Sequence, residues 1–179
     1  MSFFDSYFDA VSDCVHSVNK PLLYEASSLI SSVSSQGGKV ILAGNGGSAA
    51  IASHVSVDLV KVAGVRAVCF NEPALITCFA NDFGYEHWLE KALDYYADRA
   101  DLVLLISSGG TSRNILNGAR KAKELGLPLI TFSGFSNNNP LRAAGDLNFW
   151  ADSDTYTVVE MAHHVWLLSL SAKLAADQK

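Results

Sequence analysis

From Lys39 onward, the sequence alternates short, continuously apolar runs with stretches of helical periodicity. Continuous apolar runs are typical of strands that are buried on both faces, and strands of this kind separated by helices build a parallel sheet with helices on both sides. The alternation therefore predicts an α/β fold, a three-layer α/β/α sandwich with a Rossmann-like parallel sheet. The expected strands are residues 40–43, 67–70, 102–106, 129–132 and 147–149, and the expected helices are residues 48–62, 85–97, 112–125 and 155–176.

The segment before Lys39 has a different pattern. Apolar residues recur there at steps of three and four, which predicts two amphipathic helices, the second beginning near Pro21. No linker or repeat divides the chain, so we expect residues 1–179 to form one domain, with residues 1–36 as a helical N-terminal segment and residues 37–179 as the α/β core. The aromatic residues of the first helix favour packing between subunits, and packing within the chain is the alternative.

Composition excludes several classes of protein. The formal net charge is −5 and no Lys/Arg cluster is present, which argues against direct binding of nucleic acid. The three cysteines include no C-x-x-C pair, a usage typical of reduced thiols in a cytoplasmic protein. The sequence lacks a signal-peptide pattern and any apolar run near the ~20 residues that a membrane span requires. We therefore expect a cytoplasmic protein without membrane contact.

Two glycine- and serine-rich loops lie where an expected strand ends and an expected helix begins. The first loop is residues 44–48 and the second loop is residues 107–112. Glycines allow an anion to approach the backbone closely, and the N-terminus of the following helix is positive, so such loops can hold a phosphate. If either loop is considered alone, its serines and glycines could instead serve only to cap the following helix. Because the carboxyl ends of parallel strands meet at one edge of the sheet, both loops are expected at one crevice, around a phosphorylated ligand.

The two loops do not match the common nucleotide-binding motifs. The first loop lacks the lysine of the G-x-x-x-x-G-K-[ST] motif, and Ala49 occupies the last glycine position of G-x-G-x-x-G. We therefore expect no nucleotide cofactor and consider a sugar phosphate the most plausible ligand.

Three segments, taken together and in order, resemble the sugar isomerase (SIS) domain and, within it, the phosphoheptose isomerases. These are residues 44–50 followed by His54, residues 81–85, and residues 107–112. The resemblance implies isomerisation of sedoheptulose 7-phosphate to a phosphorylated aldoheptose, usually in a homotetramer with active sites between subunits. It implies substrate-binding roles for two groups of residues. The sugar group is Asn45, Gly46, Gly47, Ser48, Asn81 and Asp82, and the phosphate group is Ser107, Ser108, Gly109 and Ser112.

The resemblance also implies a helix histidine with an acidic residue one turn later, together with a Gln and a His on the final helix. These four residues can hold zinc in the family. His54 and Asp58 correspond to the first pair, with Asp one methylene shorter than the usual Glu, and are the candidate metal ligands. Val159 and Leu167 stand at the other two positions, and neither can bind a metal. Zinc normally takes three or four protein ligands, so its binding here is doubtful.

Glu160, His163 and His164 are the nearest substitutes, because they share one side of the expected final helix. We take His54, Asp58, Glu160 and His164 as the catalytic candidates. The alternative to a catalytic role for Glu160 and His164 is a structural pairing of the two side chains. The alternative for His54 and Asp58 is a surface cluster with Lys61. The sequence thus supports two hypotheses, an aldose–ketose isomerase and a non-catalytic SIS-domain protein that binds a sugar phosphate or assists replication initiation through a partner.

Overall fold

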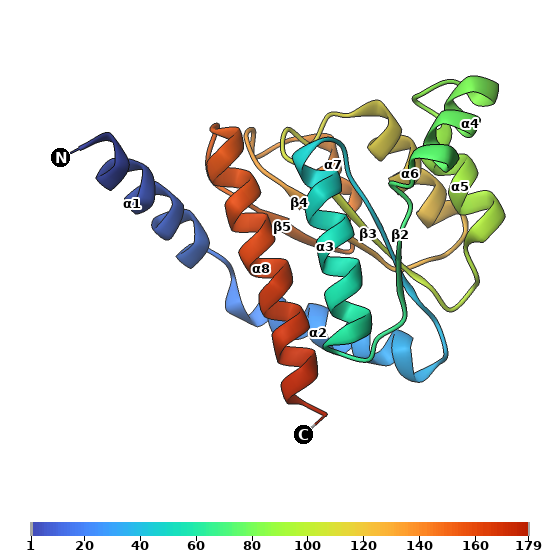
Figure 1. Ribbon diagram of the computed structural model, residues 1–179, viewed down its shortest axis with the longest axis horizontal. Coiled ribbons are helices and arrows are strands. Elements are labelled where there is room, and N and C mark those ends of the chain that lie inside the picture. The colour runs from blue at the N-terminus through green and yellow to red at the C-terminus, as the bar shows by residue number, and fades with distance from the viewer. Residues whose placement is uncertain (1, 179) are drawn as a thin grey trace.

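The computed structural model describes residues 2–178 and contains a five-stranded sheet with helices on both faces (Figure 1). The strands are β1 (Val40–Ala43), β2 (Ala67–Cys69), β3 (Leu102–Ser107), β4 (Leu129–Ser133) and β5 (Leu147–Trp150). The helices are α1 (Phe3–His16), α2 (Lys20–Ser35), α3 (Gly47–Lys61), α4 (Pro73–Phe83), α5 (Trp88–Tyr96), α6 (Arg113–Glu124), α7 (Pro140–Ala144) and α8 (Tyr156–Ala176).

All neighbouring strands are parallel, in the order β2-β1-β3-β4-β5. β1 pairs directly with β3, with Val40 opposite Leu102 and Ala43 opposite Leu105. The order reverses at this pair, since β2 lies on one side of β1 and the later strands lie on the other. In sheets of this type, ligands bind beyond the carboxyl ends of the strands at such a reversal. The first loop follows β1 and the second loop follows β3, so both lie there.

The side chains of β1 and β3 alternate between two separate cores, which makes the three-layer sandwich. Val40 and Leu42 point into a core shared with α2, α3 and α8, whereas Ile41 and Ala43 point into one shared with α5, α6 and α7. Both faces of β1, β3 and β4 are fully covered. The predicted α/β fold is therefore confirmed.

The N-terminal helix is the least embedded part of the structure. Figure 1 shows α1 reaching away from the sheet beside α8. Of its residues only Cys14 is buried, while Phe3, Phe4 and Phe8 are 77%, 66% and 63% exposed. The predicted amphipathic helix is thus present; Tyr7 packs against the core, whereas its three phenylalanines are exposed.

Two short helices were not predicted. α4 begins at Pro73, and none of its residues is fully buried, although Leu75, Ile76 and Phe79 pack against the core. α7 begins at Pro140, and Asn139 caps it by accepting a hydrogen bond from the Arg142 backbone N–H. No helix within residues 2–178 has both the length and the apolar character to cross a membrane.

Candidate functional site

The first loop is a tight turn that only glycine permits at its first position. A Cβ on Gly44 would lie 2.6 Å from the backbone carbonyl carbon of Ser48. Asn71, just beyond β2, holds this turn from the side: its Oδ1 accepts from the Gly44 N–H at 3.0 Å and its Nδ2 donates to the Gly44 carbonyl at 2.8 Å. Gly46 has a φ of 53° and caps α3 by position, without a side-chain hydrogen bond. The N-terminus of α3 therefore opens toward the crevice.

A pair of amides joins the first loop to the helix behind the second loop. Asn45 Nδ2 donates to Asn114 Oδ1 at 3.0 Å, and Asn114 Nδ2 donates back to Asn45 Oδ1 at 2.8 Å. The Tyr85 hydroxyl also donates to Asn45 Oδ1, at 3.1 Å. Because Asn114 is almost fully buried, this reciprocal pair fixes the two loops relative to each other.

The second loop presents hydroxyl groups at the N-terminus of α6. Ser107 Oγ donates to Ser112 Oγ at 3.3 Å, and Ser112 is the N-cap of α6 by position but makes no side-chain capping bond. The hydroxyl oxygen of Ser108 is buried without a hydrogen-bond partner in the structure. An unpartnered buried hydroxyl is costly, and a bound oxyanion would supply the missing acceptor. This arrangement suits a phosphate group.

The second loop rests on the end of β4. The Gly134 N–H donates to the Ser108 carbonyl at 2.7 Å, and the Leu141 N–H donates to the Gly110 carbonyl at 3.1 Å. Gly110 has a φ of 66°, and a Cβ there would overlap the side chain of Asn139. Asn139 is buried, and its Nδ2 donates to the Ser136 carbonyl at 2.8 Å. These contacts give the loop a rigid base.

Glu160 of α8 extends its carboxylate over the N-terminus of α3. A Cβ on Gly47 would lie 2.5 Å from Glu160 Oε2 and 2.6 Å from Oε1, so the glycine makes room for the carboxylate. Within the chain, Glu160 does not pair with His164, because His164 bonds elsewhere.

His54, Asp58 and His164 form a chain of polar contacts between α3 and α8. His54 Nδ1 lies 2.8 Å from His164 Nε2, and His54 Nε2 lies 3.7 Å from Asp58 Oδ2. One of the two facing ring nitrogens carries the hydrogen and the other accepts it. Partial burial lowers the pKa of His164, the charge of His54 lowers it further, and Asp58 acts in the opposite direction. The contact between the two rings gives a direct path for a proton from one histidine to the other.

His163 faces the other way, into the core. Its Nε2 lies 2.9 Å from the Ser133 carbonyl, its Nδ1 has no partner in the structure, and the side chain is fully buried. Burial lowers its pKa to about 4, against which the bond to Ser133 acts weakly. His163 is therefore a neutral structural residue, and of the two adjacent histidines only His164 faces α3.

Asn81 and Asp82 lie at the exposed end of α4, where Asn81 Nδ2 donates to Asp82 Oδ1 at 2.9 Å. The hydrogen bond that ties this part of the chain to the first loop comes from Tyr85 instead. The substrate-binding roles of Asn81 and Asp82 stay predictions.

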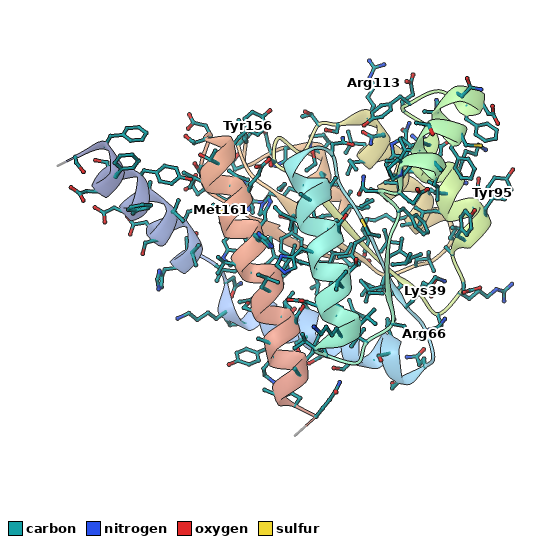
Figure 2. The ribbon with its side chains drawn as sticks, in the orientation of Figure 1. Lys39, Arg66, Tyr95, Arg113, Tyr156 and Met161 are labelled. Carbon is teal, nitrogen blue, oxygen red and sulfur yellow. The ribbon has the colours of Figure 1, made fainter. Side chains whose placement is uncertain are left out.

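Sequence reasoning missed Asn71, Tyr85, Asn114 and Asn139. Two of them could have been found from the sequence. Asn71 follows the end of a predicted strand, and Asn114 lies near the start of a predicted helix, where amide side chains can reach the loops. Arg113, beside Asn114, instead extends away from the sheet into solvent (Figure 2).

The residues present do not fit a zinc ion. Val159 and Leu167 are buried in the core, and the methyl groups of Val159 lie against Gly134. Asp58 and His164 lie at opposite ring nitrogens of His54, so one ion cannot bind all three in this arrangement. Within residues 2–178, no three His, Cys, Asp or Glu side chains are placed to hold a metal.

Comparison with known proteins agrees with this architecture. The family model of the SIS domain matches residues 6–134. The chain is 35% identical over 121 residues to the phosphoheptose isomerase of Histophilus somni, which covers 65% of this chain and 62% of that protein. It is 34% identical over 141 residues to a probable phosphoheptose isomerase of Thermoplasma acidophilum. This match covers 75% of this chain and 76% of that protein.

The fold is also that of a solved phosphoheptose isomerase from Neisseria gonorrhoeae, with a TM-score of 0.87, 21% identity, and coverage of 97% of this chain and 95% of that one. Four of the curated relatives, all phosphoheptose isomerases, are matched over only 60 to 63% of their own length. The match of the family model covers well over half of the sequence, and the loops that carry the resemblance lie within it. The chain belongs to the SIS-domain family.

Proposed function

We propose that this protein is a sugar-phosphate isomerase of the phosphoheptose isomerase type, which converts sedoheptulose 7-phosphate to D-glycero-D-manno-heptose 7-phosphate. The observation that carries the proposal is the junction of two unlike loops through Asn45 and Asn114, which brings the hydroxyls of the second loop and the N-terminus of α3 to the same edge of the sheet. The names of the relatives support the same activity. The product would be a precursor for the heptose of surface polysaccharides, and the enzyme would act in the cytoplasm.

The reaction moves a hydrogen between two adjacent carbons through an enediol. The phosphate and the reacting carbons stand at opposite ends of a heptulose 7-phosphate, so the substrate must reach from one loop to the other. The second loop holds the phosphate through Ser107, Ser108 and Ser112, and the first loop holds the sugar. The hydrogen-bonded pair of His54 and His164, with Asp58 behind it, exchanges protons with the sugar hydroxyls.

The proposal includes turnover without bound zinc, because the donor set does not fit this ion. The direct test is incubation of the purified protein with sedoheptulose 7-phosphate, with added zinc and with a chelator, and detection of the aldoheptose phosphate by NMR. We expect product at equal rates under both conditions. Tight substrate binding with no product under either condition would contradict the isomerase proposal.

That negative result would favour the second candidate, a SIS-domain protein that binds a sugar phosphate without turnover, or acts through a partner in replication initiation. The observation in its favour is that Val159 and Leu167 are core residues at positions where the family resemblance implies a Gln and a His. The crevice would then serve as a ligand sensor.

We further propose that the protein assembles with copies of itself through α1, as a homo-oligomer and most simply a tetramer. A groove of about 350 Å³ lies between α1, α2 and α8, with Leu23 and Leu170 among its apolar lining residues and Lys20 and Lys173 among its charged ones. The exposed side of α1 carries aromatic residues together with Asp5, Asp9 and Asp13. Apolar surface and opposite charges therefore complement each other between two copies, so a second copy of this chain is the occupant.

The test compares Phe4→Ser/Phe8→Ser with Tyr95→Ser, a matched removal of an exposed aromatic at the far end of the molecule (Figure 2). Sedimentation should show a smaller particle for the double variant and the wild-type size for the control. An unchanged size of the double variant would refute assembly through α1.

A further inference from the structure

The structure places the carboxylate of Glu160 directly against the first loop. Its two carboxylate oxygens lie over Gly47, in space that any Cβ at that position would occupy. The side chain is half-buried, and no ion pair within residues 2–178 involves it. A carboxylate held at the edge of a ligand crevice without a cationic partner is available to act on a ligand.

The charge of Glu160 makes the two ends of the crevice different. The carboxylate of Glu160 lies at the positive end of α3, and its negative charge disfavours a phosphate at the first loop. The second loop presents hydroxyls, and α6 has no acidic residue in its own first turn, so the phosphate is directed there. The phosphate-free end of the substrate, which contains C1 and C2, then lies toward Glu160.

We propose that Glu160 is the base that removes the C1 proton of the bound ketose. This inference rests on the proposed isomerase function and deepens it. As Glu160 takes the proton, the electrons of the C1–H bond form the C1=C2 double bond, and the C2 carbonyl oxygen gains a proton from the His54–His164 pair to give the enediol. The O1 hydroxyl then returns a proton to that pair, C1 becomes the aldehyde, and Glu160 delivers its proton to C2. The step is internally balanced and needs no oxidant, reductant or metal.

The test is Glu160→Gln, which keeps the size and removes the basic oxygen. We expect kcat to fall by about 10²-fold or more, with KM changed less than about threefold, because a general base contributes on the order of 10²–10⁴ in rate. Exchange of the C1 hydrogen with solvent deuterium should fall in parallel. The heptitol 7-phosphate, which has no carbonyl, should still bind the variant, and this shows that the variant is folded. Glu124→Gln, an exposed acid at the far end of α6, is the matched control.

The outcomes separate the two proposals. An active wild type whose Glu160→Gln variant keeps kcat within about threefold would overturn the role of Glu160 and leave the isomerase function standing. A wild type that binds the heptitol phosphate but forms no product and exchanges no C1 hydrogen would overturn both. If Glu160→Gln does not fold, Glu160→Asp replaces it: the shorter side chain withdraws the carboxylate from Gly47, and an unchanged kcat would again refute the assignment.

Discussion

The first loop, residues 44–48, and the second loop, residues 107–112, both join the carboxyl end of a strand to the N-terminus of a helix. They differ in what faces that helix end. At the first loop it is the carboxylate of Glu160, and at the second it is a set of hydroxyls with the buried, unpartnered oxygen of Ser108. Similar backbones thus carry opposite preferences for an anion, and this difference orients a ligand that has a phosphate at one end only.

The largest expected effect comes from the double substitution Ser108→Ala/Ser112→Ala. Each hydroxyl can donate to a phosphate oxygen, and a hydrogen bond to a charged group contributes about 1.5–3 kcal/mol, so the loss is about 3 kcal/mol or more, roughly 100-fold or more in affinity. Calorimetric titration with the heptitol 7-phosphate measures it.

Ser48→Ala at the first loop is the comparison at the sugar end, since Ser48 is also a buried serine at a helix start but does not face the phosphate. We expect its effect to be below about fivefold. If Ser48→Ala weakened binding as strongly as the double substitution, the two loops would be equivalent and the orientation of the substrate would be wrong.

The second effect concerns His163, which supports the end of β4 on which the second loop rests. Its pKa in the folded protein is lowered to about 4, below the ordinary value of 6.5, so the unfolded chain binds the proton more readily. Stability from this residue is therefore fully present above pH 6.5 and is lost as the pH falls toward 4. The loss amounts to about 3 kcal/mol.

His163→Gln isolates this contribution, because Gln can still donate to the Ser133 carbonyl but does not titrate. The difference in unfolding free energy between the wild type and the variant, measured in urea at several pH values, should change by about 3 kcal/mol from pH 7 to pH 4. A constant difference would show that the side chain is not a buried neutral histidine.

Much of the fold was predictable because its strands are continuous apolar runs, and these runs matched the observed strands closely. The two loops were predictable for the same reason, since glycines and hydroxyls followed such runs. Glu160 over Gly47 was not, because no local pattern sets how α8 crosses α3. The roles of His163 and His164 were also open, since adjacent positions on a helix look alike in sequence until packing separates a core face from a crevice face.

A third, smaller effect is expected from Asn114→Ala, which breaks the junction between the loops. The substitution leaves Asn45 without its two bonds to Asn114, and an unsatisfied buried polar group costs about 1–3 kcal/mol. We expect a loss of about 2 kcal/mol in unfolding free energy. Ligand affinity should fall as well, because the loops are no longer fixed relative to each other. Loss of stability with unchanged affinity would show that each loop binds independently.

Asn117→Ala provides a comparison on the same helix. Asn117 also donates through Nδ2, at 2.8 Å, to the Glu86 carbonyl, but this bond is exposed and includes no residue of either loop. It should cost less stability than Asn114→Ala and leave ligand affinity unchanged.

The smallest effect is expected from Tyr85→Phe, which removes one exposed hydrogen bond to the first loop and leaves the second loop untouched. Asn45 keeps its bonds to Asn114, so the substitution should cost about 0.5–1 kcal/mol in unfolding free energy. Tyr95→Phe, an exposed tyrosine on α5, is the control and should cost less. Urea unfolding and titration with the heptitol 7-phosphate measure both. If Tyr85→Phe weakened affinity as much as Asn114→Ala, Tyr85 would contact the sugar itself, and the sugar end of the crevice would extend past Asn45 toward α4.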